Sequence, residues 1–372
     1  MKIANVEAIP VSIPIKVPMH WATGNLKAID IVLVKITAED GTTGYAEAVP
    51  RPGIYGSTQQ SIYYAVKDYL APAFIGEDSF AVERIMEKYR LLLFSNLAAK
   101  AALDVALYDL NGKLLKTPAC HLMGGCYRTK VKLSWTNFGT YYGMDSMVED
   151  AKEKYKEGYR AIKVKAGVSI EEDIKLCTLI REACPDMEIN IDPNMVYNRE
   201  EAYRLGKALE GIIQSFEEPI QYWDDEGRKE LAGKVNIPIL SDESTFTVDM
   251  VQHQMKLGAI KRLGLKVPRT GFTLSAKAIH LAEANNIPCQ ISTQAECDLG
   301  AAACLQLAAA YRQISLPCEL ALYRNSICDT ADTMKILKTP IKIEDGYMHV
   351  PDGPGLGVEL DWDKIEAYAV RF

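Results

Sequence analysis

The sequence of 372 residues lacks the features that mark several specialised classes of protein. No apolar run reaches the roughly 18 residues that a membrane-spanning helix needs, so we expect no membrane partner. Basic residues are not in excess: 42 Lys and Arg stand against 49 Asp and Glu, and the net charge of −7 argues against a nucleic-acid partner. The nine cysteines are odd in number and include no C-x-x-C pair, which favours reduced, mostly buried thiols in a cytoplasmic protein.

The composition is that of a soluble globular protein. Hydrophobic residues make up 48% and charged residues 24%, which excludes a disordered chain because there is enough apolar surface to offset the entropy of ordering. Residues 1–21 combine early charge with prolines and are typical of a strand rather than a secretion signal, so we expect a cytoplasmic location. The length predicts two to three domains of about 150 residues, although an α/β barrel takes about 250 residues alone.

The first third of the chain predicts strands followed by helices. Apolar and polar residues alternate in places over 29–36 and 45–47, with glycines in the intervening turn at 39–44. Apolar residues then recur at helical spacing between 58 and 117. We therefore expect residues 1–127 to form an α+β domain.

Eight short apolar runs follow, most of which end in a polar residue: 131–135, 161–165, 188–192, 212–217, 237–242, 260–266, 288–292 and 316–320. The polar residues that end the second to seventh runs are 24 to 27 positions apart, which is the length of one strand, one helix and two short loops. Eight such strands predict an α/β barrel of the TIM type over residues 128–321. Residues 322–372 hold a hairpin pattern and a glycine-rich turn and are too few to fold alone, so we expect them to complete the N-terminal domain.

Three successive runs end in acidic residues, Asp192, Glu217 and Asp242. Catalytic groups of such barrels lie at the carboxyl ends of the strands, so we expect these carboxylates to converge. Carboxylates so close together repel one another unless a cation lies among them, and oxygen ligands suit Mg²⁺ or Mn²⁺. A single Asp in this position is often only a helix N-cap, but three at matching phase favour a metal site.

Lysines flank the predicted metal site on two sides. Lys163 and Lys165 share one face of the second predicted strand, because side chains alternate with a period of two, and Lys266 ends the sixth. The pair alone is also compatible with a solvated strand end. If both lysines face inward, each lowers the pKa of the other, and one of them can act as a base. The whole arrangement indicates proton transfer next to a substrate carboxylate that a metal ion binds.

These motifs together resemble the enolase superfamily and, within it, the muconate lactonizing enzyme subgroup. The resemblance covers the whole chain and includes the helical segment 98–113, Leu122-Met-Gly-Gly125, the Lys163-x-Lys165 motif and the glycine-rich turn 353–357. It implies an α+β capping domain, built from residues 1–127 and 322–372, over a modified (β/α)7β barrel at 128–321. It also implies a set of roles: Lys165 as the base with Lys163 beside it, Lys266 opposite, and Asp192, Glu217 and Asp242 as the ligands of Mg²⁺ or Mn²⁺.

The mandelate racemase branch of the superfamily does not fit, because residues 289–294 contain no histidine and Lys266 stands where that branch has an aspartate. The eighth run also lacks the Asp-x-Asp of dipeptide epimerases. The resemblance implies that loops of the cap and the strand ends set specificity. We expect the following residues at or near the substrate: His20, Trp21, Arg51, Tyr55, Trp135, Asn194, Glu243, Ser292, Thr293 and Glu319.

The predicted function is a divalent-metal-dependent isomerase that acts on a small carboxylate through an enolate-type intermediate, most like muconate cycloisomerase. Racemisation or epimerisation of an N-substituted amino acid (an N-succinyl amino acid, a betaine or a dipeptide) uses the same lysines and stays open, as does dehydration of the succinylbenzoate synthase type. A non-catalytic scaffold and an unrelated metal-dependent aldolase are disfavoured, because all five core positions hold competent residues and aldolase sites seldom set lysines on opposite sides of three carboxylates. The resemblance further implies a homo-oligomer, a dimer or an octamer.

Overall fold

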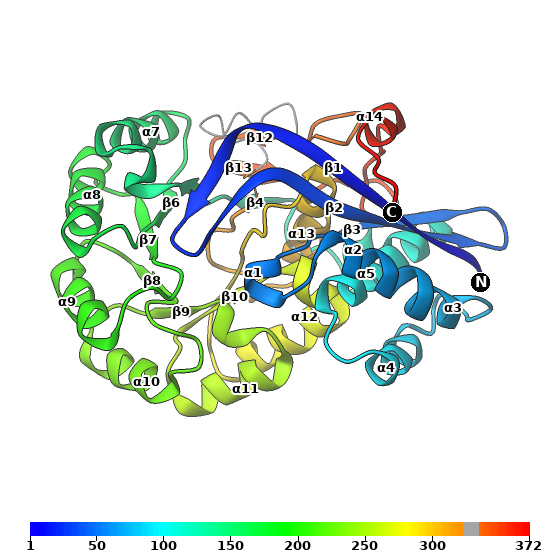
Figure 1. Cartoon of the computed structure of the whole chain (residues 1–372), viewed down its shortest axis with the longest axis horizontal. Helices are drawn as coiled ribbons and strands as arrows, with labels where there is room; N and C mark the ends of the chain where they lie inside the picture. The colour runs from blue at the N-terminus through cyan, green and yellow to red at the C-terminus, as the bar shows by residue number, and fades with distance from the viewer. Residues whose placement is uncertain (321, 323–334) are drawn as a thin grey trace.

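A computed structural model describes residues 1–320, 322 and 335–372 of the chain. Figure 1 shows a curved ring of strands surrounded by helices, and beside it a cap made from the N-terminal third together with the C-terminal tail. Two long strands of the cap, β1 (Ile3–Trp21) and β2 (Gly24–Ala38), extend across the ring (Figure 1). The predicted α/β class, a modified barrel with an α+β cap, is confirmed.

The cap begins with an antiparallel sheet in the order β1-β2-β3, where β3 is Thr43–Ala48. The β1–β2 hairpin turns between Trp21 and Gly24. Residues 31–34 of β2 are all buried, because the second face of the sheet is covered by the helix α5 (Leu97–Leu114). A Cβ atom at Gly44 would lie 2.2 Å from the carbonyl oxygen of Ala106 in α5, so this close approach requires glycine.

The remaining helices of the cap are short. They are α1 (Pro52–Tyr55), α2 (Gln59–Tyr64), the π-helix η1 (Ala65–Leu70), α3 (Ala71–Phe74), α4 (Val82–Leu92) and α6 (Ala119–Leu122). Of these, α2, η1 and α3 pack on β1 or β2, whereas α4 packs on α5. The tail closes on the same sheet: Trp362 of α14 (Trp362–Ala367) meets Tyr45 edge to face at 5.6 Å, and Ser12 N donates to the carbonyl oxygen of Tyr368.

The barrel is built from parallel strands that pair in sequence order, as βα units require. The strands are β5 (Trp135–Asn137), β6 (Ala161–Lys165), β7 (Glu188–Asp192), β8 (Ser215–Glu217), β9 (Ile239–Ser241), β10 (Arg262–Leu265) and β11 (Cys289–Ile291). The helices are α7 (Met144–Lys156), α8 (Ile170–Ala183), α9 (Arg199–Leu209), α10 (Asp225–Lys234), α11 (Val248–Leu257), α12 (Val267–Ala284) and α13 (Asp298–Ala310), with the 3-10 turns η2 (Gly139–Tyr142) and η3 (Glu243–Thr245).

The first and eighth predicted strands differ from the structure. Residues 131–135 are not one strand: β4 (Lys130–Lys132) pairs instead with β13 (Tyr347–His349) in a small antiparallel sheet with β12 (Ile343–Glu344). The eighth run, 316–320, is not a regular strand, because it makes only a few bonds to each neighbour. Even so, Cys318 N donates to the carbonyl oxygen of Lys132 and Glu319 N to that of Ile291, which closes the ring between its two ends.

The division of the chain at 127/128 and 321/322 stays a prediction, and the pairing of β4 with β13 shows that the tail also contacts the start of the predicted barrel. Residues 321 and 323–334, which include the predicted end of the barrel, lie outside the described residues.

The cap is joined to the barrel through a break in α12. Gly271 has φ 62°, outside the helical region, and the helix restarts after it. The buried Asp104 of α5 accepts hydrogen bonds from Phe272 N at 2.6 Å, Thr273 N at 2.7 Å and Thr273 Oγ1 at 2.6 Å. A carboxylate of the cap thus caps a helix of the barrel, and a Cβ atom at Gly271 would lie 2.4 Å from that carboxylate.

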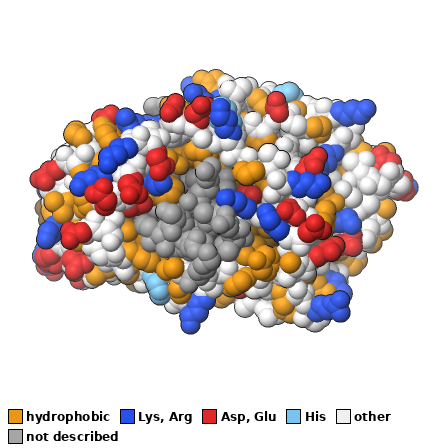
Figure 2. Space-filling model, turned by 90° about the horizontal axis from the view of Figure 1, so that it is seen from above, with side chains coloured by type: hydrophobic (Ala, Val, Ile, Leu, Met, Phe, Trp, Pro, Cys, Tyr) orange, Lys and Arg blue, Asp and Glu red, His pale blue; other side chains and the backbone are white. Residues whose placement is uncertain are grey.

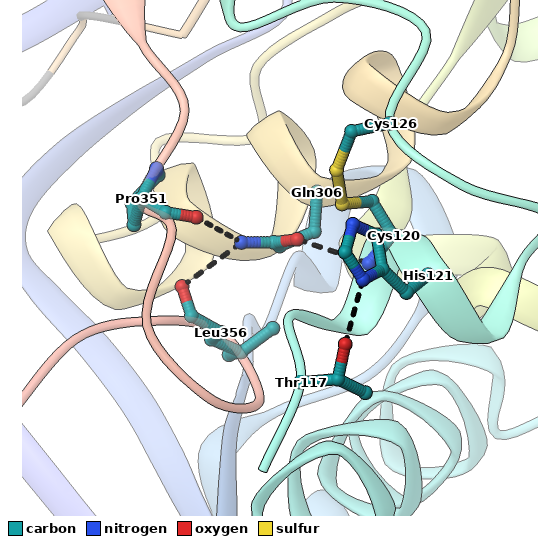
Figure 3. Close-up of a disulfide and its surroundings, with 7 residues drawn as sticks. All are labelled: Thr117, Cys120, His121, Cys126, Gln306, Pro351 and Leu356. Carbon is teal, nitrogen blue, oxygen red and sulfur yellow. Dashed lines mark hydrogen bonds between the residues drawn. A yellow bond between two sulfur atoms is a disulfide. The ribbon is translucent and has the colours of Figure 1, made fainter. Parts of the chain in front are cut away.

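The interpretation of the cysteines as reduced thiols is wrong for one pair, since the structure joins Cys120 and Cys126 in a disulfide (Figure 3). A disulfide does not require C-x-x-C spacing: a longer loop returns Cys126 to Cys120, with 5.4 Å between the two Cα atoms. The other cysteines of the described residues are free and buried, as expected: Cys177, Cys184, Cys289, Cys297, Cys304 and Cys318.

The surface and the helices agree with the composition. On the face in Figure 2, acidic and basic side chains are interspersed around the atoms drawn in grey. Among the described residues, none of the helices combines the length and the apolar character that crossing a membrane requires.

Candidate active site

The carboxyl ends of β6 to β10 bring together the charged residues that the strand-end pattern singled out: Lys163, Lys165, Asp192, Glu217, Asp242 and Lys266. Parallel pairing sets their depth, since Lys165 lies opposite Asp192 and Lys163 opposite Asn190. The alternation of side chains then places all four of these on one face. All six charged side chains except that of Lys165, which is half-buried, are buried.

Lys163 lies at the centre of this group. Its Nζ is 2.9 Å from Glu217 Oε1, 2.8 Å from Glu319 Oε2 and 3.2 Å from Asp192 Oδ2. Burial alone would lower the pKa of Lys163, but these carboxylates raise it well above its usual value. The expectation that paired lysines lower each other's pKa is therefore wrong for Lys163, because three acidic groups surround it.

Lys165 and Lys266 approach the group from different strands. Lys165 Nζ donates to Asp192 Oδ2 at 2.6 Å and to Asn194 Oδ1 at 2.9 Å. Lys266 Nζ lies 2.5 Å from Asp242 Oδ2. Burial opposes the charge of Lys266, but Asp242 raises the pKa of this lysine above its usual value. Lys266 is therefore an ammonium group at neutral pH.

The pKa values of the acidic groups are shifted in opposite directions. Burial would raise the pKa of Asp192 and of Asp242, yet the cations beside them, Lys165 and Lys163 for the first and Lys266 and Arg269 for the second, hold both below the usual range. Burial, followed by the charges of neighbouring acids, raises the pKa of Glu217 well above its usual value in spite of Lys163. Burial and the charge of Asp242 raise the pKa of Glu243 to about 8.

The donor set fits a divalent ion. Five buried acidic groups of the mouth (Asp192, Glu217, Asp242, Glu243 and Glu319) face four cations (Lys163, Lys165, Lys266 and Arg269), so full ionisation of the acids would leave one negative charge in excess. Added positive charge would stabilise the ionised form of Glu217. Carboxylate oxygens are the ligands that Mg²⁺ and Mn²⁺ prefer, and Asp192, Glu217 and Asp242 would hold such an ion.

A pocket above this group is closed on one side by the cap. It is lined by Lys165 and Lys266, by the predicted residues Trp21, Arg51, Asn194, Glu243 and Thr293, and by Met19, Leu26, Ile54, Thr136, Phe138, Gln294, Ala295 and Leu322. Arg51 is buried, and its guanidinium donates to the carbonyl oxygens of Pro50 and Gln294. Among the described residues, no carboxylate forms an ion pair with it.

Five of the ten residues predicted at or near the substrate, Trp135 among them, lie outside the lining of this pocket. Glu319 and Ser292 lie deeper, where Gln290 Nε2 donates to both at 3.0 Å. Tyr55 packs on Phe246 and donates to Gln294 Oε1 at 3.1 Å. His20 is exposed.

The expectation for Trp135 is wrong. Its indole Nε1 donates to Asp150 of α7 at 3.0 Å, on the outside of the barrel. The cause is strand alternation: the next residue, Thr136, pairs with Lys163 and lines the pocket.

Four residues that were not predicted from the sequence hold the carboxylates in place. Asn190 Nδ2 donates to Glu217 Oε2 at 2.6 Å, and Arg269 NH1 donates to Asp242 Oδ1 at 2.9 Å. Glu218 accepts from Asp242 N at 2.6 Å and from the buried Arg228 at 2.7 Å. A signal existed for Asn190, because it stands two residues before Asp192 on the same strand face. Arg269 and Arg228 gave none, since they reach the site from helices.

Comparison with known proteins bears on this geometry. Residues 146–364 match the model of the enolase C-terminal domain-like family, and residues 3–124 match the mandelate racemase/muconate lactonizing enzyme N-terminal domain. The chain belongs to the mandelate racemase/muconate lactonizing enzyme family. The protein is therefore an isomerase of the enolase superfamily. Enzymes of this superfamily generally use a divalent metal, and the relatives of this chain act on small carboxylates.

Relatives within this family differ in reaction. An L-Ala-D/L-Glu epimerase of Clostridium acetobutylicum is 30% identical over 94% of this chain and 96% of its own length. Muconate cycloisomerase 1 of Rhodococcus opacus is 27% identical over 99% of this chain and 98% of its own. The crystal structure of muconate lactonizing enzyme from Mycobacterium smegmatis with muconolactone covers 100% of both chains at 31% identity and a TM-score of 0.93.

Proposed function

We propose that this protein is a Mg²⁺-dependent isomerase, with Mn²⁺ as an alternative ion, that moves a proton at the carbon next to a substrate carboxylate and is most like muconate cycloisomerase. One observation carries the proposal. Lys165 and Lys266 line the same pocket from β6 and β10, and the carboxylates at the ends of β7, β8 and β9 lie between them. A substrate carboxylate at those three strand ends would place its α-carbon between the side chains of Lys165 and Lys266.

The residues have separate roles in this proposal. Asp192, Glu217 and Asp242 would hold the ion, which supplies positive charge to the substrate carboxylate as an enolate-type intermediate forms. Lys163 stays an ammonium group and positions Glu217 and Asp192. Lys165 would take a proton from the α-carbon or return it, and Lys266 would stabilise or protonate the opposite face.

A second candidate, racemisation or epimerisation of an N-substituted amino acid, is favoured by the same pair of lysines. Racemisation needs an acid and a base on opposite faces of one carbon, whereas cycloisomerisation needs only one proton carrier. The buried Arg51 would bind a second anionic group in either case, since two carboxylates occur both in muconate and in N-succinyl amino acids. Dehydration would follow the same proton abstraction.

An activity screen tests the proposal. The metal-free protein is reloaded with Mg²⁺ and given muconates, N-succinyl amino acids, betaines, dipeptides and a succinylbenzoate precursor in deuterated water. Lactone formation supports cycloisomerisation, label at the α-carbon with inversion supports racemisation, and loss of water supports dehydration. Lys165→Ala and Lys266→Ala serve as matched controls. Absence of turnover and of exchange for all classes would overturn the proposal.

We also propose a homo-oligomer in the cytoplasm, with neither a nucleic acid nor a membrane as partner. The support is the membership of a family of metabolic isomerases together with the net charge of −7. Sedimentation velocity of the full chain would show an assembly larger than 41.3 kDa, and cell fractionation would recover it with soluble proteins.

A further inference from the structure

The junction of cap and barrel holds a second cluster of side chains that could bind a metal ion. Its ligand atoms are sulfur and nitrogen, whereas those of the barrel mouth are carboxylate oxygens. Cys120 and His121 are neighbours in α6, and Gly124 and Gly125 adopt φ of 113° and 114°, which turns the chain back so that Cys126 reaches Cys120. One ligand atom from each of Cys120, His121 and Cys126 lies within 4.8 Å of the other two. Cys120 is buried, while His121 and Cys126 are exposed and leave a path from solvent.

The surroundings hold these side chains in place. Thr117 Oγ1 lies 2.6 Å from His121 Nδ1 (Figure 3). This contact fixes the orientation of the ring and leaves Nε2 as the nitrogen that can bind a metal ion. Gln306 of α13 accepts from Cys120 N at 3.0 Å and donates to the carbonyl oxygen of Pro351 in the tail at 2.8 Å. The backbone of Cys120 is therefore fixed by two distant segments, which lowers the cost of assembling a site.

The donor types select one class of ion. Two thiolates and one imidazole suit Zn²⁺, which prefers four tetrahedral ligands and accepts water as the fourth. Mg²⁺ prefers oxygen ligands and would remain with the carboxylates of the barrel mouth. The two clusters are thus chemically orthogonal.

We propose that Cys120, His121 and Cys126 bind Zn²⁺ when their disulfide is reduced, so that the junction is linked either by the disulfide or by the ion. A dithiol reductant supplies two electrons and two protons: the Cys120–Cys126 bond breaks, two thiols form, and the reductant becomes a disulfide. Zn²⁺ then binds the two thiolates and releases their protons to solvent. Because Cys126 is exposed and Cys120 is buried, a reductant would reach Cys126 first.

Cobalt spectroscopy of the full chain tests this site independently of catalysis. The protein is reduced with a phosphine, freed of metal, saturated with Mg²⁺ and titrated with Co²⁺. Thiolate-bound Co²⁺ absorbs in the near ultraviolet by sulfur-to-metal charge transfer, whereas Co²⁺ on carboxylates does not. We expect one thiolate-bound Co²⁺ per chain, displaced by one equivalent of Zn²⁺, and none in the oxidised protein. A reduced protein without this band would overturn the proposal.

Variants separate the ligands. Cys126→Ser removes an exposed thiol and should abolish most of the band, His121→Gln should weaken Co²⁺ binding at least about 10-fold, and Thr117→Val should weaken it by about the same factor through loss of ring orientation. His253→Gln, at an exposed histidine paired with Asp225, is the matched control and should change nothing. An unchanged band in Cys126→Ser would refute the ligand set. If a variant unfolds, as circular dichroism would show, the comparison of oxidised and reduced wild-type protein still decides.

Discussion

Buried acidic side chains occur in two regions of this protein, and the two regions differ in which groups hold the oxygens of these side chains. At the barrel mouth, Asp192, Glu217 and Asp242 are held by lysine and arginine side chains. At the junction of cap and barrel, backbone N–H groups hold Asp104, Asp298 and one oxygen of Glu47. A lysine can exchange its partner for a metal ion or a substrate, whereas a backbone N–H cannot move without disrupting its helix or strand. The mouth is therefore suited to chemistry and the junction to fixed geometry.

The largest effect is expected at the mouth. Lys165→Ala removes the proton carrier and should reduce turnover on the physiological substrate about 10³-fold, equivalent to about 4 kcal/mol of barrier, while the unfolding temperature changes little because Lys163 remains as a cation beside Asp192. Steady-state kinetics and thermal unfolding measure the two. The exposed Lys261→Ala is the control. Turnover within tenfold of the wild type would contradict the role of Lys165.

The next largest effect at constant pH is expected at the junction of cap and barrel, where a substitution should lower stability rather than turnover. Asp104→Ala leaves Phe272 N, Thr273 N and Thr273 Oγ1 without their acceptor, which should lower the free energy of unfolding by about 3 kcal/mol. Urea denaturation measures this loss. Asp104→Asn keeps an acceptor oxygen and should lose less. A large fall in kcat of the folded Asn variant would show that the junction also acts in catalysis.

A third test uses pH. Burial, with the charges of Glu296 and Asp298, raises the pKa of Glu47 to about 8. The folded state thus keeps a proton that the unfolded chain loses near pH 4.5, and the stability that Glu47 contributes falls as pH rises through this window. Glu47→Gln cannot ionise, so its stability relative to the wild type should increase by about 4 kcal/mol between pH 5 and pH 9. Unfolding midpoints across that range measure the difference, and parallel profiles would contradict it.

The smallest effect is expected where a side-chain cation only supplements backbone donors. Asp109 accepts from Tyr45 N at 2.8 Å and Leu356 N at 2.7 Å, and the partly exposed Lys113 adds an ion pair at 2.6 Å. Lys113→Ala should therefore cost less than about 1 kcal/mol of stability. A loss as large as that of Asp104→Ala would mean that side-chain charge matters equally in both regions.

Part of the fold and of the candidate site could be predicted from the sequence, because the pattern of apolar and polar residues along the strands is periodic. The spacing of strand ends placed Asp192, Glu217 and Asp242 on consecutive strands, and a period of two set Lys163 and Lys165 on one face. The position of Trp135 was predicted wrongly because the same alternation was not applied to the first strand. Residues 316–320 were predicted to form a regular strand because of their apolar composition. That composition does not reveal that only a few backbone hydrogen bonds join these residues to each neighbouring segment.

The sequence by itself determined the barrel, its cap and the charged residues at the strand ends, because local periodicity fixes which side chains face inward. Only the tertiary structure decided which partners those charges meet. Arg269, Arg228 and Asp104 come from helices, and Cys126 returns to Cys120 through a glycine turn, so their contacts depend on how elements pack rather than on spacing along the chain. The raised pKa of Lys163 has the same origin, since Asp192, Glu217 and Glu319, the carboxylates around it, come from three separate segments of the chain.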